Sequence, residues 1–388
     1  MKDSARVLGL GRGQTLDPRV ALKRRRATET WAGHAKVLLV TFAGAAVVLA
    51  GFIGALNPYG NLPGFTGPHV IMDDNQRYQY PALVRMGDFD SVVIGTSTSR
   101  LLDPEMLDGR LGGRFINLAL NDGRAWEQAQ MMALVSRSVP QLKTLFIGLD
   151  EVWCADNADT ERTTKRGFPQ WMYDDNPWND LAFMLNGKAV EIAARKLAHH
   201  LGLAKERISP RGFEVFVPPD ETYDAAKAAK KIWNRREGMR TARVPAQAVS
   251  EEERRSWRFP ALQWLDESLE RSGAERTILA FMPVHVAGQP QIGSVSAARE
   301  AECKAQIAEV ARRHGAYLID FRIHSSLTKT DANYWDHLHY RLAVGRRILD
   351  EVAKAVGSGV GSPNGTWVLL VRPGLTRLSP KIRGLQRP

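Results

Sequence analysis

The sequence predicts an α/β protein in which a parallel sheet is covered on both faces, preceded by one N-terminal transmembrane helix. Short apolar segments alternate with segments of helical periodicity, a pattern typical of strands joined by crossover helices. A charge-free apolar stretch of bilayer length lies before them. The predicted strands are residues 92–95, 114–120, 144–149, 277–283 and 316–321.

The N-terminal apolar stretch, residues 37–56, predicts a membrane anchor. It contains no charged residue, and at about 1.5 Å per residue it spans about 30 Å, the thickness of the hydrocarbon core of a bilayer. Basic residues precede it, so the positive-inside rule places residues 1–36 in the cytoplasm as a basic tail. A cleaved signal peptide and a buried core helix are the alternatives. The length of the N-terminal region and of the apolar stretch favours an uncleaved single-pass anchor in the inner membrane.

The remaining chain divides by composition. The first part of residues 57–87 is rich in Pro and Gly and predicts a linker, followed by a folded domain at 88–356. Within that domain, residues 151–272 are rich in Trp, Arg and Pro and lack the strand pattern, which resumes afterwards. We therefore expect an insertion there, and a flexible basic tail at 357–388.

Overall composition restricts the class of protein. The chain has 388 residues, of which 44% are hydrophobic and 24% charged, enough to bury one large core or two modest ones. Its formal net charge is +11, but much of the excess lies in the two tails, without interleaved aromatic residues. We therefore expect no nucleic-acid partner.

Only two cysteines occur, Cys154 and Cys303. This number excludes a disulfide framework and a metal site built on thiolates. Two separate buried thiols are favoured over a single bridge, because a core of this size does not need a covalent staple. We expect neither a metal ion nor a cofactor.

Two short motifs far apart in the chain suggest one active site. The first predicted strand ends at Gly95, where a sharp turn would present the hydroxyl of Ser97 at the carboxyl edge of the sheet. Near the end of the chain, Asp336 precedes His339 by three residues. Acyl transfer through serine needs a nucleophile, a base that takes its proton and a group that fixes the tautomer of the base. Ser97, His339 and Asp336 can fill these roles in that order.

Each motif alone has an ordinary structural explanation. Ser97 or Ser99 could cap a helix, and the Asp336–His339 pair could lie in a solvated loop. Their occurrence together, in this order and at opposite ends of an α/β pattern, favours catalysis. His337 is the alternative base, since it lies directly beside Asp336.

These motifs make the chain resemble the SGNH or GDSL-type esterases and acyltransferases over residues 88–355. It is most similar to membrane-anchored members that modify cell-surface polymers, such as the D-alanyl transfer protein of teichoic acids and the alginate acetyltransferases. The resemblance implies a flavodoxin-like three-layer sandwich with Ser97 as nucleophile, Asp336 as acid and His339 as base. It also implies a glycan or glycolipid substrate and a multi-pass membrane protein that delivers the acyl group.

The resemblance further implies the oxyanion hole. Residues 117–123 approach the second sequence block of the family, so Gly123 is the expected amide donor, one residue later than usual. Asn121 is a substitute donor, with a turn-forming asparagine as the alternative. The asparagine of the third block is missing, and Asp150 follows the third predicted strand instead.

The sequence therefore predicts a serine-dependent O-acyltransferase or esterase that acts on an extracytoplasmic glycan or glycolipid, on the periplasmic or extracellular side of the membrane. The weakened oxyanion hole fits a transferase better than a strong hydrolase. The alternative is a catalytically degenerate SGNH-like component that binds glycan or supports assembly.

Overall fold

The computed structural model describes residues 18–62, 70–176, 178–234 and 244–374. The chain forms two compact units, Met1–Leu56 and Asn57–Pro388. In the described part of the first unit the chain is one helix, α1 (Pro18–Leu56). Within the described residues, its segment Thr30–Leu56 is the one helix long and apolar enough to cross a membrane.

The predicted anchor at 37–56 lies inside that segment. The predicted basic tail at 1–36 is not separate from it where the structure describes it, because α1 already begins at Pro18. Residues 1–17 lie outside the described residues.

The second unit contains a six-stranded sheet with the order β2-β1-β3-β4-β5-β6. The first five strands are parallel, and β6 is antiparallel to β5. All five segments predicted as strands form strands. The strands are β1 (Ser91–Ile94), β2 (Phe115–Asn117), β3 (Thr144–Leu149), β4 (Arg276–Phe281), β5 (Tyr317–Asp320) and β6 (Val368–Val371).

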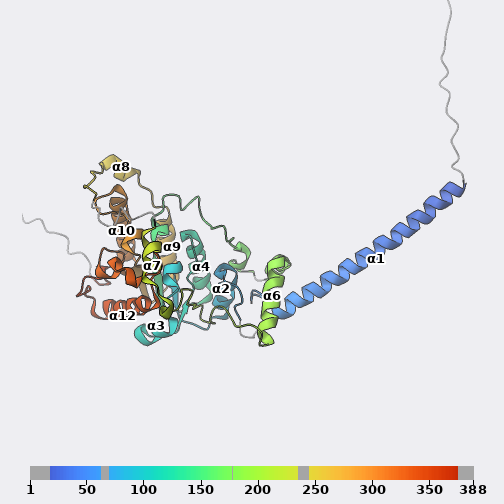
Figure 1. Ribbon diagram of the computed structural model, residues 1–388, viewed down its shortest axis with the longest axis horizontal. Coiled ribbons are helices and arrows are strands. Elements are labelled where there is room, and N and C mark those ends of the chain that lie inside the picture. The colour runs from blue at the N-terminus through green and yellow to red at the C-terminus, as the bar shows by residue number, and fades with distance from the viewer. Residues whose placement is uncertain (1–17, 63–69, 177, 235–243, 375–388) are drawn as a thin grey trace, which may run out of the picture. The chain divides into compact units, whose positions relative to one another are not determined.

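Helices cover both faces of this sheet. The strands β1 to β3 are buried along their whole length, which requires covering layers on both sides. Two helices, α3 (Pro104–Leu111) and α12 (Leu342–Ser358), pack together (Figure 1). The helix α9 (Ala261–Ser272) contacts both α4 (Ala125–Ser138) and α10 (Val295–Arg313). Right-handed crossovers place these two sets on opposite faces of the sheet.

Local sequence explains where the covering helices begin. Asp103 accepts a hydrogen bond from the Glu105 amide and is followed by Pro104, a residue favoured in the first turn, so α3 begins there. Ser294 accepts from the Ala297 amide and caps α10 in the same way. These caps fix the helix starts at the carboxyl edge of the sheet.

The predicted insertion at 151–272 contains no strand within its described residues. Its last segment, however, is the helix α9, which belongs to the helical layer that covers the sheet. Because α9 packs on α4, the insertion ends before residue 261 rather than at 272. The other elements of this region are η2 (Glu151–Cys154), η3 (Gln170–Met172), α5 (Asp180–Met184), α6 (Gly187–His200), η4 (Asp220–Thr222), α7 (Ala225–Trp233) and α8 (Glu251–Ser256).

Two segments predicted to lack regular structure are ordered elements. The second half of the predicted linker at 57–87 forms α2 (Gln76–Met86), which is largely buried because it packs on α4. In the predicted tail at 357–388, β6 pairs with β5 at the edge of the sheet. Residues 63–69 and 375–388 lie outside the described residues.

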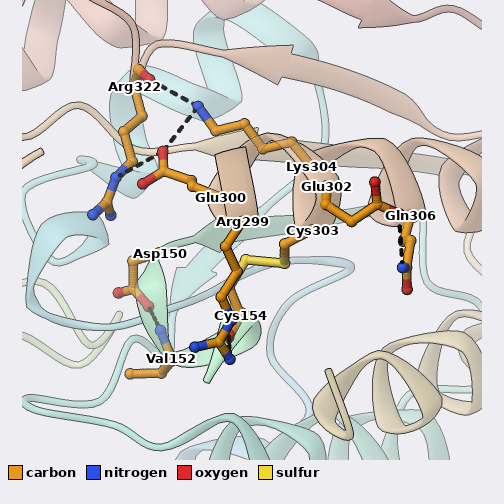
Figure 2. Close-up of a disulfide and its surroundings, with 10 residues drawn as sticks. All are labelled: Asp150, Val152, Cys154, Arg299, Glu300, Glu302, Cys303, Lys304, Gln306 and Arg322. Carbon is orange, nitrogen blue, oxygen red and sulfur yellow. Dashed lines mark hydrogen bonds and ion pairs between the residues drawn. A yellow bond between two sulfur atoms is a disulfide. The ribbon is translucent and has the colours of Figure 1, made fainter. Parts of the chain in front are cut away.

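The two cysteines form a disulfide, so the expectation of two separate thiols is wrong. Cys154, at the end of η2, is bonded to Cys303 on α10, and the two Cα atoms are 5.8 Å apart (Figure 2). The residues are 149 positions apart in the chain. They meet because η2 follows β3 and α10 follows β4, and these strands are neighbours in the sheet.

Replacing both cysteines, Cys154→Ala with Cys303→Ala, should lower the free energy of unfolding by about 2–5 kcal/mol, because the bridge restricts the unfolded chain. Thermal unfolding of the full-length protein in detergent, with and without reductant, measures this. Reductant should lower the wild-type midpoint to that of the double variant and leave the variant unchanged. Reaction of both cysteines of the unreduced, denatured wild type with maleimide would show that the bridge does not form.

Candidate active site

The turn after β1 presents Ser97 at the carboxyl edge of the sheet. The chain leaves β1 through Gly95, and residues Ser97–Ser99 form a short 3-10 turn, η1. A Cβ atom at Gly95 would lie 2.3 Å from the Oγ of Ser99, and one at Gly148 of β3 would lie 1.9 Å from the same oxygen. Both positions therefore need glycine for the turn to pack this closely on the neighbouring strand.

Hydrogen bonds from two other parts of the chain hold the same turn. The side-chain amide of Asn117, the last residue of β2, donates to the carbonyls of Ser99 and Leu102 at 2.9 Å each. The hydroxyl of Tyr340 donates to the carbonyl of Thr98. Asn117 and Tyr340 are both buried. The position of Ser97 is thus fixed by two buried side chains whose role at this turn the sequence motifs did not indicate.

The structure brings together the three residues predicted as a triad. The Nε2 of His339 lies 3.0 Å from the Oγ of Ser97, and its Nδ1 lies 2.9 Å from the Oδ2 of Asp336. The second oxygen of Asp336 accepts from the amides of Leu338 and His339, both at 2.8 Å. Ser97 and His339 are 242 residues apart in the chain and meet because β1 and the loop before α12 lie at the same edge of the sheet.

The charge of Asp336 fixes the tautomer of the histidine. Burial raises the pKa of Asp336, but the His339 ring and the two backbone amides outweigh this effect and hold the pKa at about 2. The carboxylate is therefore ionised near neutral pH and can only accept hydrogen bonds. The proton of the ring then resides on Nδ1, and Nε2 is left with a lone pair toward Ser97.

The alternative base, His337, contacts the segment around His285 and Gly288. Its carbonyl accepts from the amide of His285 at 3.0 Å, and its ring lies beside Gly288, where a Cβ would be 3.3 Å from the Cδ2 atom. The hydrogen bonds to Ser97 and Asp336 are made by His339. The spacing of three residues, rather than adjacency, thus gives the geometry of a triad.

The predicted oxyanion donors, Gly123 and Asn121, lie in a loop whose amides have other partners. The amide of Gly123 donates to the carbonyl of Leu120 at 3.1 Å, and the amide of Asn121 donates to the side chain of Gln76 at 3.2 Å. The fully buried Arg77 donates to the carbonyl of Asn121 at 2.9 Å. The structure therefore uses the Gly123 amide, a predicted donor, and the backbone of Asn121 to build the loop.

A buried ion pair between Arg77 and Glu127 holds the loop of Asn121 and Gly123 in place. Arg77 and Glu127 are each fully buried and form two hydrogen bonds, of 2.8 and 2.6 Å. Glu127 also accepts from the amide of Arg124 at 2.8 Å. The bidentate geometry and the additional bonds satisfy both charges, as burial of an ion pair requires.

Asp150 lies next to the serine turn, at the end of β3. Its side chain accepts a hydrogen bond from the hydroxyl of Thr96, the residue before Ser97, and another from the amide of Val152 at 3.3 Å. Burial raises the pKa of this carboxyl group to about 6, although both hydrogen bonds and the charge of Arg322 lower it. The sequence marks Asp150 only as a departure from the family pattern.

The insertion places one aromatic side chain, Phe216, beside His339, which the sequence did not predict. The ring of Phe216 meets the ring of His339 edge to face, with centroids 5.4 Å apart. The guanidinium carbon of Arg100 lies 4.5 Å from the centroid of Phe216, and Arg100 forms an ion pair with Glu214. No motif surrounds Phe216, so only its position in the fold could reveal it.

No protein-family model matches this chain, and a search of the curated proteins finds no match. The function proposed below therefore depends on the residues and their geometry.

Asp150→Asn should stabilise the protein relative to wild type more at pH 7 than at pH 4. With a pKa raised to about 6, the folded state keeps a proton that the unfolded state loses near pH 4, so wild-type stability falls as the pH rises through this window. The neutral amide removes this loss, which is at most about 3 kcal/mol. Thermal unfolding of the full-length protein in detergent between pH 4 and 8 measures it.

Asp90→Asn is the matched control. Partial burial raises the pKa of Asp90, but hydrogen bonds from Lys143 and from the amide of Arg114 lower it overall. The change in the free energy of unfolding caused by Asp90→Asn should therefore be constant above pH 5. If the Asp150 variant shows the same flat profile, the carboxyl group is not buried as described.

Proposed function

We propose that this protein is a membrane-anchored serine acyl-transfer enzyme of the SGNH type, an O-acyltransferase or esterase that acts on an extracytoplasmic glycan or glycolipid. The proposal depends on one observation, the continuous hydrogen-bonded chain from Ser97 through His339 to Asp336 at the carboxyl edge of the sheet. The chain order and the three-residue spacing of acid and base are those of the SGNH pattern.

The geometry supports a two-step reaction. The Oγ of Ser97 attacks the carbonyl carbon of an acyl donor while Nε2 of His339 takes its proton. The bond between the acyl carbon and the leaving group of the donor then breaks, and the leaving group departs with that proton. A hydroxyl group of the acceptor, or water in an esterase, then attacks the acyl-enzyme and transfers its proton to Nε2. The bond between the acyl carbon and the Oγ of Ser97 breaks, and Oγ takes that proton back from Nε2. Asp336 holds the ring in place and stabilises the imidazolium in both steps.

The strand order supports the family assignment. The order 2-1-3-4-5 of the parallel strands is the flavodoxin-like doubly wound order, in which sites form at the carboxyl edge where the order reverses. Here the reversal lies between β1 and β3, and Ser97 and Asp150 follow those strands directly.

Two groups can stabilise the oxyanion. We assign one role to the amide of Ser97, at the start of the 3-10 turn, where no partner within the turn is available to it. The second is Asp150, since a protonated carboxylic acid can donate a hydrogen bond as an asparagine side chain does. With its pKa raised to about 6, Asp150 has that form below about pH 6 and is mostly ionised at pH 7, where it cannot donate.

The disulfide supports the extracytoplasmic assignment. Bridges persist in oxidising compartments such as the periplasm and are rare in the cytosol. Cys154–Cys303 lies in the second unit, so that unit belongs outside the cytoplasm if α1 is the anchor. The glycan acceptor and the multi-pass membrane protein that supplies the acyl group follow from the family resemblance.

A non-catalytic role in glycan binding or assembly is the second candidate. The observation that favours it is the loop of Gly123 and Asn121, whose amides already have partners within the fold. A protein of this kind would keep the serine turn as a structural element.

A fluorophosphonate probe distinguishes the two candidates, because it labels a serine only when a base activates it. Labelling of the full-length protein in detergent should be lost in Ser97→Ala and His339→Ala. Asp336→Asn should slow hydrolysis of p-nitrophenyl acetate by about 10⁴-fold, as in serine proteases with the wrong tautomer. His314→Ala is the matched control, since His314 forms a similar pair with Asp266, at 2.7 Å, without any serine.

Two results would contradict the assignment. Unlabelled but folded wild-type protein would favour the binding role. Labelling that depends on His337 rather than His339 would show that the register of the triad is wrong.

The orientation of the anchor is tested by a reporter fusion. Alkaline phosphatase fused after Gly64 should be active, because this enzyme matures only outside the cytoplasm. Green fluorescent protein fused at the same residue should be dark, because it does not become fluorescent when it is exported in an unfolded state. The basic residues before residue 37 determine this direction. The opposite pair of results would place the second unit in the cytoplasm and remove the extracytoplasmic substrate class.

A further inference from the structure

Three hollows adjoin one another along the first turns of α10 at the carboxyl edge of the sheet. The central hollow has a volume of about 520 Å³, the outer hollow beside Trp257 about 570 Å³ and the inner hollow beside His324 about 290 Å³. Arg299 lines both the central and the outer hollow, and Lys304 lines both the central and the inner hollow. Shared side chains make the three hollows neighbours in one row.

The central hollow adjoins the triad. Leu338, which lines it, lies between the acid and the base of the triad and donates its amide to Asp336. Asp150, which also lines it, accepts from the hydroxyl of Thr96, directly before Ser97. The central hollow is therefore lined by residues in direct contact with the serine turn and with the acid of the triad.

The lining offers hydrogen-bond donors that the fold does not use. Arg322 is 5% exposed, and its closest carboxylate contacts, to Glu151 and Glu300, are 3.7 and 3.6 Å long. The contact to Glu300 is made by the buried Nε of Arg322 and is too long for a hydrogen bond, and the buried Nε of Arg299 makes no hydrogen bond either. Figure 2 shows Arg322, Glu300 and Arg299 around the disulfide. Buried donors without a hydrogen bond are costly, so a ligand oxygen that reaches them on binding would relieve that cost.

The charges of the central hollow are balanced. Three cationic side chains, Arg299, Lys304 and Arg322, are accompanied by three acidic ones, which are Asp150, Glu151 and Glu300. A site for a free anion would have an excess of positive charge. A lining with both donors and acceptors instead suits hydroxyl groups, each of which donates and accepts.

The outer hollow adds an aromatic surface. Trp257 is partly exposed there and can stack on the apolar face of a sugar ring. The disulfide fixes the distance between the two sides of the central hollow, because Cys154 lines it and Cys303 lies on α10 (Figure 2). The three hollows together therefore offer more volume than a small acyl group fills.

From these observations we infer that the row of hollows binds one extended glycan chain, the acceptor of the acyl group, with the reacting sugar in the central hollow. The inference rests on the proposed function and names its substrate as a polymer rather than a single sugar or a glycolipid head group. The chain runs along α10 from Trp257 through Arg299 to the inner hollow.

The probe is polysaccharide isolated from the envelope of the source organism, partly hydrolysed, labelled at its reducing end and fractionated by size. Binding to the full-length protein in detergent should strengthen by about tenfold or more from single sugars to long fragments, which is about 1.4 kcal/mol. Fragments longer than the row should gain nothing further.

Ser296→Trp tests the row itself. Ser296 is exposed and lines both the central and the outer hollow, so an indole there blocks the passage between them without disturbing the core. It should weaken binding of long fragments by about tenfold and leave that of single sugars unchanged. Ala305→Trp, at an exposed position on the same helix outside the three hollows, is the matched control and should bind as wild type does.

Affinity that does not depend on fragment length, or that Ser296→Trp leaves unchanged, would overturn the inference. Displacement of all fragments by inorganic phosphate would also overturn it and indicate an anion site. Fluorophosphonate labelling separates this inference from the proposed function. Labelled protein that binds no fragment refutes the glycan row alone, whereas length-dependent binding without labelling refutes the catalysis alone.

Discussion

The close packing of the serine turn against the sheet is the constraint on which the rest of the site depends. Gly95 and Gly148 leave room for Ser99 directly on the backbone of the neighbouring strand, and a Cβ at either position would overlap with its hydroxyl oxygen. With the turn fixed in this way, Ser97 projects from the carboxyl edge toward His339. A bulkier residue at either glycine would move the hydroxyl of Ser97 away from His339. The proposed catalysis depends on this distance, because a misplacement of about 1 Å can lower a rate by about 10²-fold.

Parts of the chain that are distant in sequence complete the site. The loop before α12 supplies Asp336 and His339, the proposed acid and base, and Tyr340 from the same loop holds the serine turn. The insertion supplies Phe216 beside the base. The disulfide joins the segment after β3 to α10 and so fixes two sides of the central hollow. Parallel strands make this possible, because all their carboxyl ends meet at one edge.

Two carboxyl groups near the serine have opposite electrostatic environments. The histidine ring and two amides outweigh burial at Asp336 and hold its pKa at about 2, whereas burial dominates at Asp150 and raises its pKa to about 6. The first group is therefore a carboxylate suited to holding a cation, whereas the second keeps its proton up to about pH 6. Such separation of two acids by their surroundings is the usual basis for dividing roles within an active site.

The sequence by itself determined the five parallel strands, the apolar helix and the three residues that meet at the edge of the sheet, because each depends on local periodicity or on a short motif. The tertiary structure decided the Cys154–Cys303 bond, the position of Phe216, the order in α2 and β6 and the partners of the Gly123 amide. These features depend on which layers and loops pack together over long separations in the chain. Local patterns do not encode such contacts, since burial and hydrogen-bond partners exist only once the layers have assembled.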